Sequence, residues 1–295
     1  MKRHHPWAEK GIEALALSLP ETRIRGYCCP LCVKFFDSPE DLTVEHAPAQ
    51  SVGGKAMAVT CRPCNSRSGH ELEVHVAAAR RMSDFAEGRS ELDIAFEVHG
   101  RSVNATAAIR GDAISVVAAP KRTNPAAQAA FISEMQRLAV TKASPVKGSV
   151  VFRVGPLDAR RERAAWLKAG FLIAFAAWGY RYALRPILNR IRAQIAEPDS
   201  PTLERAAFRD SNQGERGGRW LIIVRQPEDL RCVLVEIDDW RVMLPDFTPE
   251  PDFYERLSAA MIRRGTSATY TGDLMPWPEQ PLYALDYQMA GMPLK

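Results

Sequence analysis

Two Cys-x-x-Cys pairs constrain the fold of this chain more than any other feature. The first is "CPLC" and the second is "CRPC", and 28 residues (33–60) separate them. Two intervening residues let a chain fold back, so each pair presents two thiolates to one tetrahedral zinc ion. The predicted ligands are Cys29, Cys32, Cys61 and Cys64. Cys28 offers an alternative to Cys29, which we favour because C-x-x-C is the commoner ligand spacing.

The sequence around the cysteines favours metal binding over disulfide bonds. Five of the six cysteines lie between residues 28 and 64, and the N-terminus has no uninterrupted apolar stretch typical of a secretory signal. The most apolar segment, 169–180, is too short for a membrane span, which needs about 18 residues. We therefore expect a cytoplasmic protein without a membrane partner. A structural zinc would contribute on the order of 10 kcal/mol to folding.

Between and after the two Cys pairs lies a second group of polar residues that zinc does not need. "DLTVEHAP" and "KAMAVTC" read as two short strands joined at Gly-Gly, and a helix follows "CNSRSG". Zinc would hold the strand bearing Glu45 and His46 near the helix start bearing Asn65. A carboxylate and an amide oxygen are ligands for a hard divalent cation, and a neutral histidine beside them can accept a proton from water.

At these residues the chain resembles the HNH endonuclease family, whose core is the ββα-metal fold. The match runs from Tyr27 to His75 through "CPLC", "LTVEHAPAQSVGGK" and "TCRPCNSRSG". The resemblance implies a DNA endonuclease with His46 as general base, Glu45 and Asn65 as ligands of Mg²⁺ or Mn²⁺, and the four cysteines on zinc. The family usually has Asp at the Glu45 position and an Asn near 55–57, where this chain has Lys-Ala-Met.

His70 is a further candidate, because it follows Gly69 early in the predicted helix. It is placed to approach the cation or a phosphate, or to serve as a surface or capping residue. Both interpretations remain open from the sequence.

The remainder of the chain predicts an α+β domain. Three β-leaning runs follow Gly88, then helices and further strands alternate to the C-terminus. We expect an HNH-like zinc module over residues 1–90 and an α+β domain over 91–295 that recognises substrate or partner. Between Arg160 and Ala193 eight basic residues accompany one acidic residue, a net charge of +7 within a chain of +4. This segment either contacts phosphates or has acidic partners elsewhere in the fold.

The leading hypothesis is therefore a metal-dependent endonuclease acting on DNA. The alternatives are a zinc-stabilised nucleic-acid-binding protein without catalysis, and a structural zinc module in a protein-interaction protein. The missing middle Asn motivates the first alternative.

Overall fold

The computed structural model describes most of the chain, and its helices and antiparallel sheets confirm the α+β class. The described residues are 5–20, 26–141, 147–200, 202–203, 205–210, 218–248, 250–265 and 269–284. They form two compact units: residues 1–73 with 158–295, called unit 1, and residues 74–157, called unit 2. This grouping differs from the boundary expected near residue 90, because the hairpin after the first Cys pair packs against a helix that begins at residue 159.

The N-terminal part of unit 1 has the expected order of strand, turn, strand and helix. Antiparallel β3 and β4 pair from Leu42↔Cys61 to Ala47↔Lys55, with a bulge between Glu45 and His46. The elements of this part are α1 (Pro6–Ser18), β1 (Tyr27–Cys28), β2 (Phe35–Phe36), β3 (Leu42–Ala47), β4 (Lys55–Cys61), α2 (Arg62–Ser68) and the π-helical turn η3 (Gly69–Glu73).

The C-terminal part of unit 1 contains a five-stranded antiparallel sheet of order β13-β10-β11-β12-β9. The runs "LIIV" and "CVLV" occupy its central strands and are buried. The elements are α5 (Ala159–Ala183), α6 (Asn189–Ala196), β9 (Ala207–Arg209), β10 (Gly218–Gln226), β11 (Cys232–Asp238), β12 (Trp240–Leu244), α7 (Phe253–Arg264) and β13 (Thr271–Pro276).

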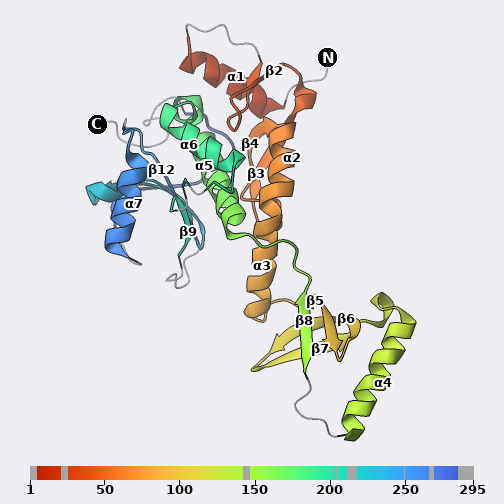
Figure 1. Cartoon of the computed structure of the whole chain (residues 1–295). Coiled ribbons are helices and arrows are strands. Elements are labelled where there is room, and N and C mark those ends of the chain that lie inside the picture. Colours follow the sequence, from red (N-terminus) through yellow and green to blue (C-terminus); the bar gives the residue numbers. More distant parts are fainter. Residues whose placement is uncertain are drawn as a thin grey trace. The chain divides into compact units, whose positions relative to one another are not determined.

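Helix α5 is the core of unit 1. It starts at an Asp158 cap, whose carboxylate accepts the backbone N–H groups of Arg160 and Arg161, and it is buried from residue 164 to 180. It contacts β3 and β4 as well as β9, β11 and β12, and Figure 1 shows it between the hairpin and the five-stranded sheet. Gly170 allows close approach, since a Cβ there would meet Val242 at 2.6 Å. One apolar helix thus joins the cysteine-rich hairpin to the C-terminal sheet.

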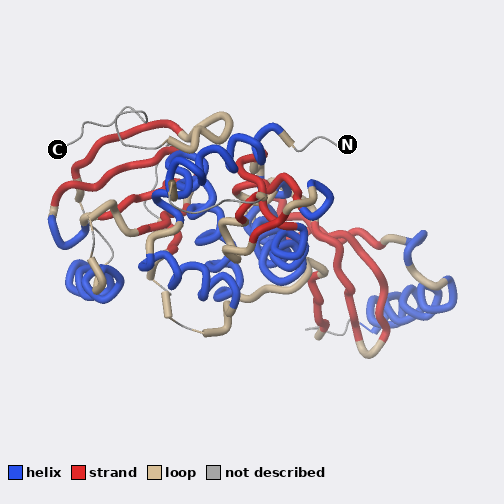
Figure 2. The backbone as a smooth tube through the Cα atoms, turned by 90° about the horizontal axis from the view of Figure 1, so that it is seen from above, coloured by secondary structure: helices blue, strands red, loops and turns tan. Residues whose placement is uncertain are grey.

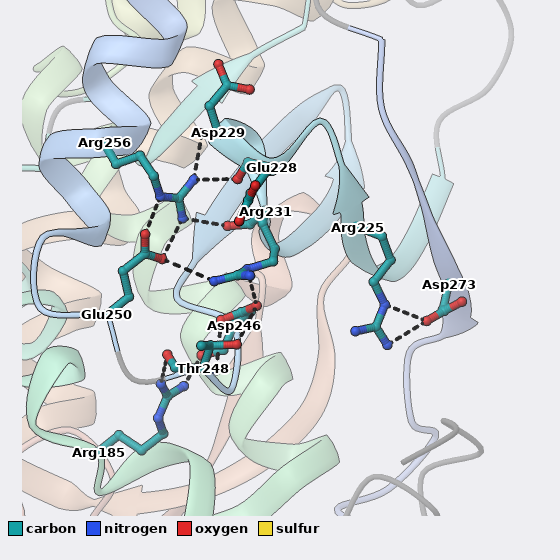
Figure 3. A network of polar contacts seen from close by, with 10 residues as sticks. All are labelled: Arg185, Arg225, Glu228, Asp229, Arg231, Asp246, Thr248, Glu250, Arg256 and Asp273. Carbon is teal, nitrogen blue, oxygen red and sulfur yellow. Dashed lines mark hydrogen bonds and ion pairs between the residues drawn. The ribbon is translucent and has the colours of Figure 1, made fainter. Parts of the chain in front are cut away.

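Helix α7 is attached to the sheet by a network of arginines (Figure 3). The Arg256 guanidinium donates to the carbonyls of Asp229 and Arg231 and to the carboxylate of Glu250. The Arg256 contact lowers the pKa of the Glu250 carboxyl. Several charged side chains in the C-terminal part of unit 1 therefore have structural partners within the fold.

Unit 2 is a four-stranded antiparallel sheet of order β7-β6-β5-β8 with helices packed against it. Phe85 of the first helix and Ile94 of the sheet belong to its core, and Phe131 of the second helix packs on Phe96. Figure 2 shows this second helix alongside the strands. The elements are α3 (Val74–Ala86), β5 (Leu92–Val98), β6 (Arg101–Arg110), β7 (Ala113–Ala118), α4 (Pro125–Thr141) and β8 (Gly148–Phe152).

Candidate metal centre and adjoining polar cluster

Four cysteine sulfurs converge where β1, β4 and α2 meet. The Sγ atoms of Cys29, Cys32, Cys61 and Cys64 all lie within 4.8 Å of one another. The Sγ atoms of Cys32 and Cys61 are 3.8 Å apart. A tetrahedron with Zn–S bonds of about 2.3 Å has edges of about 3.8 Å, so the cluster has the dimensions and the donors of a structural zinc site.

Of the two adjacent cysteines, Cys29 and not Cys28 has its sulfur in the cluster. The Cys28 sulfur lies outside the cluster, with the Cys29 carbonyl at 4.0 Å as its partner. The Cys28 carbonyl accepts a hydrogen bond from the Tyr180 hydroxyl at 2.6 Å. Cys28 therefore has a packing role.

Glu45 is buried in an ion pair. Its side chain is 2% exposed, and its Oε1 atom lies 2.9 Å from Nζ of Lys168, which projects from α5 and is 1% exposed. The Thr60 hydroxyl donates to Oε2 of Glu45 at 3.1 Å. Lys168 also contacts the carboxylate of Glu73 at the end of η3. Both Glu45 oxygens thus have a partner within the protein.

The charges of this cluster depend on one another. Burial raises the pKa of Glu45, and Lys168 opposes that rise. Burial alone would lower the pKa of Lys168, but the two carboxylates raise it overall, so the amine stays protonated. The cluster therefore holds a fixed ammonium group beside Glu45 at neutral pH.

Asn65 lies on the same side of the hairpin as Glu45. Its amide nitrogen donates to the Val44 carbonyl at 3.3 Å and to the Thr43 hydroxyl at 3.4 Å. The amide of α2 is therefore bonded to β3 one residue before Glu45, as expected if the zinc cluster positions the helix on the strand.

The two candidate histidines are placed differently. His46 is half-buried near the end of β3, directly after Glu45 and at the bulge in the β3–β4 pairing. His70 is exposed in η3. Neither imidazole makes a hydrogen bond or ion pair to another described residue. Both rings are free to interact with a ligand or with water.

Three of the eight basic residues between 160 and 193 pair with acidic residues inside unit 1. Arg161 pairs with Asp199 and Arg190 pairs with Glu255. With Lys168 buried between two glutamates, acidic partners from elsewhere in the fold account for three of the basic residues.

Lys168, Thr60 and Glu73 belong to this cluster, although the sequence interpretation did not include them as site residues. The available signal was Lys168 itself, a lone charge in the apolar run "AAWLKAGFLIAFAAW". A lysine buried in such a helix needs a carboxylate partner, and Glu45 in "TVEHA" is the buried carboxylate that pairs with it.

No family model, curated protein or solved structure matches this chain. Within the described ranges, none of the helices has the length and apolar character of a membrane span.

Proposed function

We propose that the chain is a metal-dependent endonuclease of the HNH type that hydrolyses phosphodiester bonds in DNA. The observation that supports this most is the placement of Glu45 and Asn65 on one side of a strand–turn–strand–helix unit, with His46 next along the strand. Zinc bound by the four-cysteine cluster would hold the two ends of that unit together.

The donor chemistry of Glu45 and Asn65 suits a hard divalent cation. The partners of the Glu45 carboxylate occupy one position on each oxygen, and a carboxylate has about four lone-pair sites. The amide nitrogen of Asn65 is used by β3, which leaves its oxygen as the ligand atom. When bound, Mg²⁺ or Mn²⁺ would stabilise negative charge on the phosphate and the leaving oxygen.

In this proposal the remaining chemistry comes from the histidines. His46, free of internal hydrogen bonds, accepts a proton from the attacking water at a ring nitrogen. His70, exposed one turn after Asn65, donates a hydrogen bond to a phosphate oxygen.

The decisive experiment is a plasmid-nicking assay with the zinc-loaded protein in Mg²⁺ or Mn²⁺. His46→Ala should lose about 10²–10⁴-fold in rate, the usual contribution of a general base. His99→Ala is the matched control, since His99 is exposed in unit 2 and pairs with Glu134. If neither ion supports nicking by the wild type, or if His46→Ala nicks as fast as His99→Ala, the endonuclease proposal is wrong.

A second candidate function is nucleic-acid binding without hydrolysis, and the Lys168–Glu45 ion pair favours it. An ammonium beside Glu45 opposes a divalent cation there. This candidate predicts binding that weakens steeply with salt and no nicking with any metal. Arg67→Ala should weaken binding, because Arg67 is exposed on α2. Arg137→Ala should not, because Arg137 pairs with Glu134 in unit 2. No affinity even at low salt would instead indicate the protein-interaction alternative.

A further inference from the structure

The contact between Lys168 and Glu45 places a positive charge at the carboxylate that the proposed cation needs. Lys168 is almost fully buried, and its ammonium is shared by Glu45 and Glu73. Two carboxylates and one ammonium leave a net charge of −1 in this cluster. The ammonium lies against the one buried carboxylate that the proposed cation requires.

A divalent cation and this ammonium compete for the same carboxylate. Repulsion between a double and a single positive charge a few ångströms apart is large in a partly buried site, even at an effective dielectric constant of about 20. Replacing the lysine by a neutral side chain removes one positive charge from the cluster. Cation binding at Glu45 is then favoured by the removal of that repulsion.

Glu73 gives Lys168 a second carboxylate partner. The Glu73 side chain is 22% exposed, whereas that of Glu45 is 2% exposed, so Glu73 has better access to solvent. Glu73 also ends the π-helical turn that carries His70. Single π-helical turns within helices often occur at functional sites, because they widen the backbone locally. Lys168 can therefore leave Glu45 and keep one carboxylate partner.

We propose that Lys168 is a positioning residue that closes Glu45 to divalent cations in the resting protein, and that Glu73 retains the lysine when Glu45 is released. This inference rests on the proposed endonuclease function for the identity of the cation. Its consequence is that the wild-type protein needs a higher concentration of Mg²⁺ or Mn²⁺ than a protein lacking the ammonium.

The test is Mn²⁺ binding by the zinc-loaded full chain, followed by the electron paramagnetic resonance signal of free Mn²⁺. Lys168→Met should half-saturate at an Mn²⁺ concentration about tenfold or more below that of the wild type. Glu45→Gln in the Lys168→Met background should abolish this gain and so locate the ion. Lys121→Met removes an exposed lysine of unit 2 and should leave binding unchanged.

Three results would overturn the inference. The first is equal half-saturation in wild type and Lys168→Met. The second is a gain that survives Glu45→Gln. The third concerns Glu73→Gln, which leaves Lys168 with Glu45 alone and should bind Mn²⁺ no better than wild type. Tighter binding by Glu73→Gln contradicts the proposal. Lys168→Gln carries the same expectation as Lys168→Met if the methionine variant does not fold, and the Glu73→Gln arm applies in either case.

Nicking measured in the same titration separates the two proposals. If Lys168→Met gains Mn²⁺ at Glu45 but neither protein nicks DNA, Lys168 controls cation access and the endonuclease proposal fails. If both proteins nick DNA with the same Mn²⁺ dependence and bind it equally, the endonuclease proposal stands and the role of Lys168 is refuted.

Discussion

Substituting the two adjacent cysteines, Cys28 and Cys29, provides a sharp test of the metal centre. Both side chains are buried, at 1% and 0% exposure, but only the Cys29 sulfur belongs to the four-cysteine cluster. Cys29→Ser should therefore lose zinc, while Cys28→Ser should retain one zinc per chain. Cys28 and Cys29 differ in the position of their sulfur atoms but are almost equally buried. Each variant is therefore a control for the other.

The expected energies differ as well. Cys28→Ser buries a hydroxyl in place of a thiol, which costs about 1–3 kcal/mol if the hydroxyl finds no partner. Cys29→Ser removes one of four ligands from a site that contributes on the order of 10 kcal/mol. Because the net stability of a protein is typically about 5–15 kcal/mol, this loss is comparable with the stability of the fold.

Zinc content by elemental analysis and thermal unfolding by circular dichroism measure both effects. Chelation of the wild-type zinc should reproduce the Cys29→Ser phenotype and should change Cys29→Ser itself very little. Retention of a full zinc equivalent by Cys29→Ser, together with loss of zinc from Cys28→Ser, would refute the assignment of the ligands.

Three further predictions concern unit 1. Gly170→Ala should destabilise the protein and lower the midpoint of urea unfolding. Overpacking against Val242 costs about 1–3 kcal/mol, which outweighs the roughly 1 kcal/mol that alanine gains over glycine in a helix. Tyr180→Phe removes one buried hydrogen bond and should cost about 1 kcal/mol by the same assay, and an unchanged midpoint would contradict the bond's contribution. Arg256 lowers the pKa of Glu250 in the folded state, so this carboxylate stabilises the protein above the ordinary value of 4.5 and the benefit is lost as pH falls through the lowered value. The stability difference between wild type and Glu250→Gln should therefore shrink under acid, and a difference that stays constant would contradict the linkage.

Local features of the sequence predicted the four-cysteine cluster well. The spacing of the cysteines brings four sulfurs together, and Gly-Gly between two short β-leaning runs favours a hairpin, so the cysteine cluster and the element order strand, turn, strand, helix agree with the expectation. Cys29 rather than Cys28 belongs to the cluster for the same reason, since a two-residue spacer determines which sulfurs can converge.

Features that depend on distant partners were not predictable in the same way. The basic count between 160 and 193 left open whether this segment contacts phosphates or has acidic partners elsewhere, and the partners of Arg161, Lys168 and Arg190 come from other elements. The domain boundary expected near residue 90 likewise ignored helix α5, which completes the core around the hairpin. The catalytic roles of His46, Glu45, Asn65 and His70, and the nucleic-acid partner, stay predictions.

The discontinuity of unit 1 has a consequence for synthesis of the chain. All four cysteines have been translated by residue 64, whereas Lys168 follows Glu45 by 123 residues. At about 5–20 residues per second, a ribosome needs roughly 6–25 s to make that interval. For this time the nascent hairpin has its thiolates but lacks the apolar helix and the positive charge that later bury Glu45. Zinc captured early would hold the hairpin in register until α5 emerges. Metal supply during translation should therefore determine what fraction of the newly made chains reaches the folded state.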